Sequence, residues 1–171
     1  FLSDKGEKCI PPKKGRSHLR RIIRDIVEFK PESNGTDIGE ALRFLTNAIK
    51  KKCTAFVLSA MMDVDENCAP RYEESLQIAA NRHDVSVINI YDPREREIPD
   101  VGLVQICDAE TGARSWVDTS SSAMRKAYSQ WSRKAYDNMV STLRKYRIDQ
   151  VSIATDQDYV KGLIGFFKNR A

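Results

Sequence analysis

Oxygen-bearing side chains that could bind a cation or a polar partner lie in two stretches of the sequence. Thr36 and Asp37 precede an apolar helical pattern, and Asp63 follows the apolar run 55–62. Hydroxyl and carboxylate oxygens at the end of a strand suit a hard cation such as Mg²⁺. We therefore take Thr36, Asp37 and Asp63 as candidate partner-binding residues, and Thr36 as a candidate metal ligand. A helix N-cap is the simpler role for Thr36, because its hydroxyl can accept a backbone N–H bond.

The acidic segment that begins at Asp63 also imitates a calcium-binding loop. Asp63, Asp65 and Glu74 occupy the first, third and twelfth places of such a loop. Its sixth place, which requires glycine, is Cys68, and Pro70 stands at the eighth. The sequence therefore favours a solvated acidic loop over a calcium site. Among the hypotheses for the function of this chain, we rank a metal hydrolase that uses Asp63 last.

Four arginines in and beside the helical pattern 17–29 form a candidate anion-binding cluster. The net charge of the chain is +4, and the positive charge is concentrated in residues 1–60. Such a cluster could bind phosphate or nucleic acid. Aromatic residues that would stack bases do not interleave with it, which favours a solvated helix face and disfavours nucleic acid. The cluster consists of Arg16, Arg20, Arg21 and Arg24.

The remaining motifs do not indicate an enzyme. No nucleophile stands beside a base in a recognised pattern, and no glycine-rich loop could cradle a phosphate. The four cysteines and two histidines have no zinc-site spacing, which favours a reduced, cytoplasmic protein without a bound cofactor. The longest apolar run, 55–62, is too short to span a bilayer, and no signal peptide is visible.

Helical and strand patterns alternate along the chain. Amphipathic helices are predicted over 17–29, from 38 to 49, over 72–81, from about 120 to 146 and from about 156 onward. Strands are predicted at 54–59, 85–91 and 151–154, and a β-hairpin at 101–107 and 114–118. This order predicts one α/β domain over 1–171, with a mostly parallel sheet, helices on both faces and an inserted hairpin.

Two further expectations concern burial. The run 54–59 is apolar without alternation, which predicts a strand covered on both faces. The regular spacing of large aromatic side chains predicts that they belong to the core. These aromatic residues are Trp116, Tyr128, Trp131 and Phe167.

Four stretches of the sequence and three shorter ones carry a family resemblance. They are IPPKKG at 10–15, KPESNGTDI at 30–38, AFVLS at 55–59 and IYDPRE at 90–95, with shorter matches at 108–112, 116–118 and 159–161. Together they resemble a bacterial family of von Willebrand factor A-like proteins, catalogued as domain of unknown function fifty-eight. The resemblance implies a three-layer, Rossmann-like fold that binds a divalent metal and its partners at the carboxyl ends of the strands. It also implies a non-enzymatic role with a MoxR-type ATPase, in assembly or as a chaperone-like factor.

The sequence departs from that family in two ways. The first strand and its Asp-x-Ser-x-Ser metal loop are absent, and Ala60 stands where the family has a later acidic residue. The expectation is therefore a fragment without bound cofactor, with Mg²⁺ only in the intact protein. A missing central strand also leaves an unpaired sheet edge, which predicts self-association of the chain.

Overall fold

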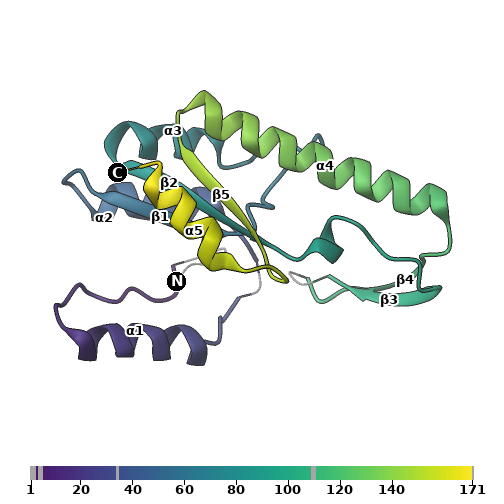
Figure 1. The fold of residues 1–171 in the computed structure, drawn as a ribbon, viewed down its shortest axis with the longest axis horizontal. Coiled ribbons are helices and arrows are strands. Elements are labelled where there is room, and N and C mark those ends of the chain that lie inside the picture. The colour runs from purple at the N-terminus through teal and green to yellow at the C-terminus, as the bar shows by residue number, and fades with distance from the viewer. Residues whose placement is uncertain (1–2, 4–5, 34, 109–110, 171) are drawn as a thin grey trace.

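The computed structural model describes residues 3, 6–33, 35–108 and 111–170. Within these residues the chain alternates helices and strands, as predicted (Figure 1). A single 3₁₀ turn, Pro93–Glu95, follows the second strand. The elements are α1 (Arg16–Glu28), α2 (Ile38–Ala48), β1 (Thr54–Ser59), α3 (Glu73–Arg82), β2 (Asp84–Tyr91), β3 (Leu103–Cys107), β4 (Arg114–Asp118), α4 (Ser122–Lys145), β5 (Asp149–Ala154) and α5 (Tyr159–Lys168).

Three strands form a parallel sheet in the order β1-β2-β5, which confirms the predicted mixed α/β class. The central strand β2 is buried over most of its length. Strands β3 and β4 form a separate antiparallel hairpin. Gly112 at its turn has φ +69°, a conformation that favours glycine.

Helices cover both faces of the sheet. On one face, side chains of α2, α3 and α4 surround Val85 and Val87 of β2 and form the core. On the other face lies α5, where the Phe167 ring meets the Phe56 ring edge-on with centroids 5.7 Å apart. Figure 1 shows α5 crossing the sheet on the side opposite α2 and α3.

Strand β1 is less covered than its sequence predicts. Phe56 and Leu58 are 42% and 62% exposed, whereas Ala55, Val57 and Ser59 are half-buried. The prediction of cover on both faces is therefore wrong for β1. The physical reason is that β1 is an edge strand, and α5 covers only part of its outer face.

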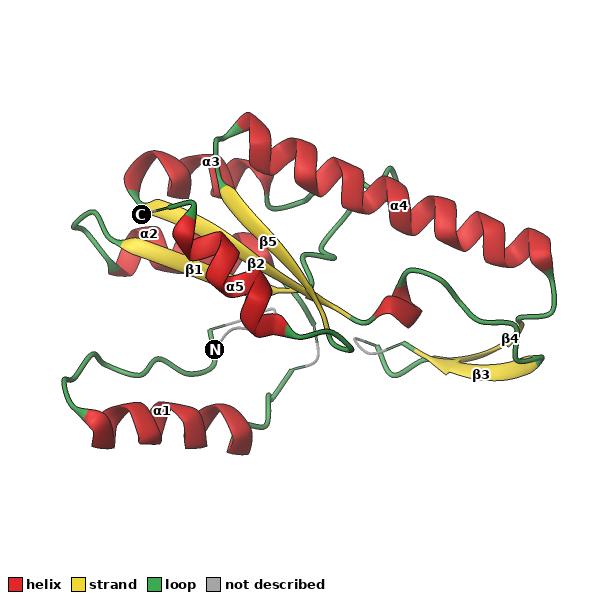
Figure 2. Ribbon diagram, in the orientation of Figure 1, coloured by secondary structure: helices red, strands yellow, loops and turns green. Residues whose placement is uncertain are grey.

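Helix α1 lies apart from the sheet (Figure 2). None of its residues is buried. Its apolar stripe, which includes Leu19, Ile23, Ile26 and Val27, is more than half exposed. Lys8 contacts Asp25 at 3.3 Å and ties the preceding segment to the helix.

The aromatic side chains are also more exposed than predicted. Trp116, Trp131 and Phe167 are exposed and Tyr128 is half-buried, so their assignment to the core is wrong. Figure 1 shows the amino end of α4 reaching past the sheet toward the β3–β4 hairpin, where no second layer covers it. Among the described helices, each is too short or too polar to cross a membrane.

Candidate functional site

A cavity of about 400 Å³ opens at the carboxyl ends of β1 and β2. We call it the rim cavity. Its walls come from residues 60–62 after β1, from Asn89 and Tyr91 of β2, and from one side of α4, with Thr36 also in its lining. Ligands of open α/β sheets bind outside the carboxyl ends of the strands, so this is the expected position for a site.

The chain turns sharply where it leaves β1. Met61 has φ +56°, a left-handed conformation that costs a non-glycine residue roughly 1–2 kcal/mol. The turn is held because the Met61 N–H donates to Ser59 Oγ at 3.1 Å and the Tyr72 hydroxyl donates to the Met61 carbonyl at 3.5 Å. Met61 is almost completely buried. The turn thereby directs the next residues, including Asp63, back toward α2.

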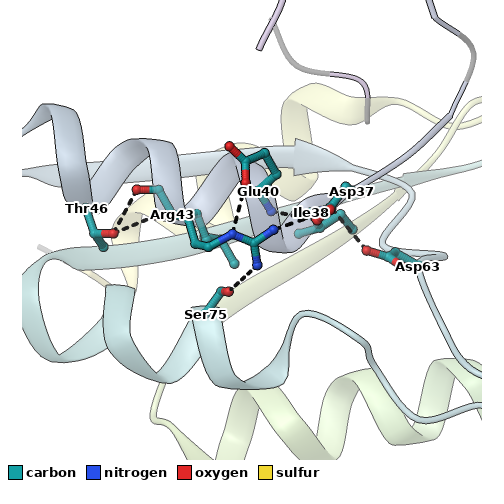
Figure 3. A network of polar contacts seen from close by, with 8 residues as sticks. Asp37, Ile38, Glu40, Arg43, Thr46, Asp63 and Ser75 are labelled. Atoms are coloured by element: carbon teal, nitrogen blue, oxygen red, sulfur yellow. Dashed lines mark hydrogen bonds and ion pairs between the residues drawn. The ribbon is translucent and has the colours of Figure 1, made fainter. Parts of the chain in front are cut away.

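Asp37 and Asp63 both bind the amino end of α2 (Figure 3). Asp37 is the N-cap, and its Oδ1 accepts the Glu40 N–H at 2.6 Å. Asp63 Oδ2 accepts the Ile38 N–H at 3.1 Å in a buried hydrogen bond. These bonds satisfy two N–H groups that a helix start leaves free, and the negative charges favour the positive end of the helix dipole.

The N-cap role predicted for Thr36 is therefore wrong. The helix begins at Ile38, so the capping position falls on Asp37, whose carboxylate reaches the third N–H. Thr36 lies one residue earlier and is exposed.

The Asp37 carboxylate has a second function in the scaffold. The Arg43 guanidinium lies 3.4 Å from Asp37 Oδ2 and 2.9 Å from Glu40 Oε2, and it also donates to Ser75 Oγ of α3 (Figure 3). The hydrogen bond to Glu40 raises the pKa of Arg43, and the charge of Asp37 adds to this effect. Arg43 thus links the start of α2 to α3.

Asp63 also affects the protonation of Tyr72, a residue of the hydrophobic core. Tyr72 is fully buried, and its pKa is raised far above the ordinary tyrosine range by burial and, secondarily, by the negative charge of Asp63. The structure thus brings Thr36, Asp37 and Asp63 together at one end of α2. The hydrogen bonds to α2 account for the positions of the Asp37 and Asp63 carboxylates. Partner binding by Thr36, Asp37 and Asp63 stays a prediction.

The rim does not fit the magnesium ion that the family resemblance implies. Thr36 offers one hydroxyl, Ala60 offers no ligand, and the Asp37 and Asp63 carboxylates bind backbone N–H groups of α2. Across residues 3, 6–33, 35–108 and 111–170, His, Cys, Asp and Glu side chains form no group of three that could hold a metal. Asp65 Oδ1 accepts the N–H groups of Asn67 and Ala69, each at 2.8 Å, so it closes its own loop.

Aromatic side chains and one arginine form the far wall of the rim cavity. The Arg96 guanidinium lies over the Tyr91 ring at 3.3 Å and over the Tyr136 ring at 4.4 Å. The Tyr128 and Trp131 rings pack with centroids 5.8 Å apart. The Tyr128 hydroxyl donates to the Glu95 carbonyl at 2.7 Å, which joins α4 to the loop after β2.

Sequence reasoning missed this wall because its spacing on α4 imitates a core stripe. Tyr128 and Trp131 are three residues apart, and the buried Ala135 and Met139 continue the stripe at intervals of four residues. A single helix pattern cannot show where the covering sheet ends. Alternating charges such as those around Arg96 are typical of a solvated surface turn, and the stacking of Arg96 between two tyrosines has no signal in the sequence.

Asn89 supplies a polar group to the floor of the cavity. It is 2% exposed, and its Nδ2 donates to Ser152 Oγ at 3.3 Å. Its Oδ1 has no hydrogen-bond partner among the described residues. Since buried polar atoms are nearly always paired, an unpaired oxygen at a cavity marks a place for a ligand donor.

The arginines predicted as an anion site lie on α1, away from the rim cavity. Arg16, Arg20, Arg21 and Arg24 are all exposed. Arg21 lies 3.6 Å from Asp25 of the same helix. Their position agrees with a solvated helix face, and anion binding there stays a prediction.

Known proteins similar to this chain define its family. The chain belongs to the family described as protein of unknown function DUF58, which matches residues 1–138. The uncharacterized protein MAV169 of Mycobacterium avium is 24% identical over 163 residues, which cover 94% of this chain and 93% of that protein. The uncharacterized proteins Mb1516 of Mycobacterium bovis and Rv1480 of Mycobacterium tuberculosis are each 26% identical over 163 residues. The chain covers 50% of each of these two relatives, and no solved structure matches it significantly.

Proposed function

We propose that this member of the family is a non-enzymatic interaction module that docks a protein partner over the rim cavity. One observation carries the proposal: a cavity with aromatic walls ends on a buried Asn89 oxygen that has no partner in the described chain. Concave, mostly apolar sites with a few polar groups are typical of ligand binding.

The residue types at the rim support a protein partner. Tryptophan, tyrosine and arginine dominate the binding energy of protein interfaces. Trp131 is 41% exposed beside Tyr128, and Arg96 is held rigidly between two tyrosine rings. Such preorganised side chains lose little conformational freedom on binding. Thr36, Asp37 and Asp63 lie at or beside the same rim and are proposed to contact the partner's edge.

The partner that we propose is a MoxR-type ATPase, in an assembly or chaperone-like role in the cytoplasm. The family resemblance supports this choice. A von Willebrand factor A-like, three-layer arrangement belongs to the same proposal, and the parallel order β1-β2-β5 with helices on both faces supports it.

The test measures the affinity of the purified chain for a purified MoxR-type ATPase of the same bacterium, by biolayer interferometry. Trp131→Ala removes an exposed aromatic anchor, and interface hot spots lose about 2 kcal/mol or more, so the dissociation constant should rise about thirtyfold. Trp116→Ala is the matched control, because Trp116 is also exposed but lies on β4 and does not line the cavity. Absence of binding by the unmodified chain, or equal losses in both variants, contradicts the proposal.

A further inference from the structure

A second cavity, of about 540 Å³, lies at the opposite, amino end of the sheet. Its lining is largely polar and charged, and it includes Lys52, Cys53, Thr54, His83, Asp84 and Arg147. In its wall, Cys53 Sγ lies 3.4 Å from His83 Nδ1. A thiol beside an imidazole is the pair that activates cysteine nucleophiles.

The strand register brings these two side chains together. Cys53 and His83 each stand one residue before a strand, and those strands pair with Thr54 opposite Asp84. The Asp84 N–H donates to the Cys53 carbonyl at 2.9 Å. The His83 N–H donates to the Ala79 carbonyl at 2.8 Å and ends α3. Because the backbone fixes both residues, the pair is built into the sheet rather than formed by chance on the surface.

The histidine has an unused nitrogen. His83 is 3% exposed, and its Nε2 has no hydrogen-bond partner among the described residues. A buried imidazole that serves only packing usually has both ring nitrogens bonded, since an unpaired one costs about 1–3 kcal/mol. Cys53 itself is only partly buried and lines the cavity, so a small molecule can reach its sulfur.

The charges around the pair favour an anionic reagent. Lys52 and Arg147 line the cavity. The Asp84 carboxylate also faces it, but Arg170 contacts both its oxygens, at 2.6 and 2.7 Å. The Tyr146 hydroxyl at the same cavity donates to Glu73 at 2.9 Å. The cavity volume lies within the range of sites for small ligands.

We infer that Cys53 and His83 form a modification site that takes up an anionic, low-molecular-weight thiol from its disulfide. His83 Nδ1 accepts the Cys53 thiol proton as Sγ attacks one sulfur of the disulfide. The Cys53–sulfur bond forms, the disulfide bond of the reagent breaks, and the departing thiolate takes the proton from His83. The product is a mixed disulfide on Cys53 and one free thiol. This site is independent of the rim cavity and of the function proposed for it.

The experiment exposes the chain to glutathione disulfide at pH 7 and follows each cysteine by peptide mass spectrometry. Cys9 and Cys107 are exposed and serve as internal references. General-base assistance is worth on the order of 10²–10⁴-fold when fully aligned, so Cys53 should react at least about tenfold faster than either reference. Equal or slower reaction of Cys53 in the unmodified chain overturns the inference without any variant.

Two variants distinguish general-base assistance by His83 from simple accessibility of the Cys53 thiol. His83→Asn should remove the excess rate at Cys53 and leave Cys9 and Cys107 unchanged. Cys53→Ser should remove the fast phase of glutathione uptake altogether. A His83→Asn chain that keeps its native circular dichroism and still modifies Cys53 at the original rate also overturns the inference.

Discussion

Removal of the Asp63 carboxylate should destabilise the whole domain, because that group holds the first N–H of α2. Asp63 Oδ2 accepts the Ile38 N–H at 3.1 Å, and the bond is buried. A hydrogen bond to a charged group contributes about 1.5–3 kcal/mol, and the N–H that is left behind is buried without a partner. Asp63→Ala should therefore lower the free energy of unfolding by about 2–3 kcal/mol.

Asp63→Asn refines this prediction. The asparagine oxygen can still accept the Ile38 N–H, so only the charge at the helix end is lost, worth roughly 0.3–1 kcal/mol. For a domain of this size, about 2 kcal/mol corresponds to a fall in Tm of roughly 4–8 °C. The order of stability should therefore be wild type, then Asp63→Asn, then Asp63→Ala.

Urea denaturation and thermal melting, both followed by circular dichroism, measure these changes. Glu66→Gln is the control, because Glu66 is exposed in the same loop and the change also removes one negative charge. An Asp63→Ala chain as stable as the Glu66→Gln chain would refute the capping role. The hydrolase reading instead predicts Mg²⁺- or Mn²⁺-dependent turnover that Asp63→Asn abolishes.

Three other predictions concern pH, association and salt. Burial and, secondarily, Asp63 raise the pKa of Tyr72, so the stability that neutral Tyr72 supplies is complete below its unfolded-state pKa near 10 and falls as pH rises beyond it. The wild-type Tm should therefore fall in melting curves recorded above about pH 10, and Tyr72→Phe should flatten this fall. Leu58 is exposed on edge strand β1, so light scattering should detect dimers of the wild-type chain. Leu58→Lys should abolish these dimers, whereas the control Ile78→Lys on α3 should not. A stable wild-type monomer at high concentration contradicts this prediction. If the α1 arginines bind oligonucleotides, affinity should fall steeply with salt and Arg20→Gln should reduce the slope by about one; a salt-independent signal excludes that alternative.

Parts of the fold that depend on local pattern were predictable from the sequence. The continuous apolar run at 54–59 predicts a strand of a parallel sheet, the pattern at 85–91 predicts a further strand, and the alternation with helices predicts the α/β class. Burial was predicted less well, because it depends on what covers each face. Leu58 and Val87 belong to equally apolar runs, yet only Val87 lies in a central strand.

The candidate sites depend on contacts between distant segments, which no local pattern encodes. Cys53 and His83 are 30 residues apart and meet only through the register of β1 and β2. Arg96, in the turn after β2, meets Tyr136 of α4 in the far wall of the rim cavity, and this contact too joins segments far apart in the sequence. Asp37 and Asp63, which the sequence indicated as candidate site residues, chiefly bind the amino end of α2. A carboxylate can stabilise a helix N-terminus as readily as it can bind a cation, so the residue type alone does not distinguish the two roles.

The unpartnered oxygen of Asn89 leads to a prediction that separates stability from binding. Asn89→Leu replaces the side chain by an apolar one of the same branched shape and removes a buried acceptor that has no partner in the described structure. Ser152 Oγ keeps Gln150 and Tyr136 within 3.3 and 3.4 Å, so the change leaves it partnered. Since deleting an unsatisfied polar atom is nearly neutral or stabilising, Tm should stay the same or rise.

Binding of the partner should weaken in the same Asn89→Leu chain. The partner's hydrogen-bond donor, which we propose bonds to Asn89 Oδ1, would then be buried against an apolar side chain without an acceptor. That penalty is about 1–3 kcal/mol, which corresponds to a rise in the dissociation constant of about five- to 150-fold. Ser86→Ala is the matched control: Ser86 Oγ on β2 is also buried and has no hydrogen-bond partner among the described residues, but Ser86 does not line the rim cavity. It should keep both stability and affinity. If Asn89→Leu unfolds the chain while Ser86→Ala does not, Asn89 stabilises the fold rather than binding a partner. The rim cavity then lacks the polar group on which its proposed function rests.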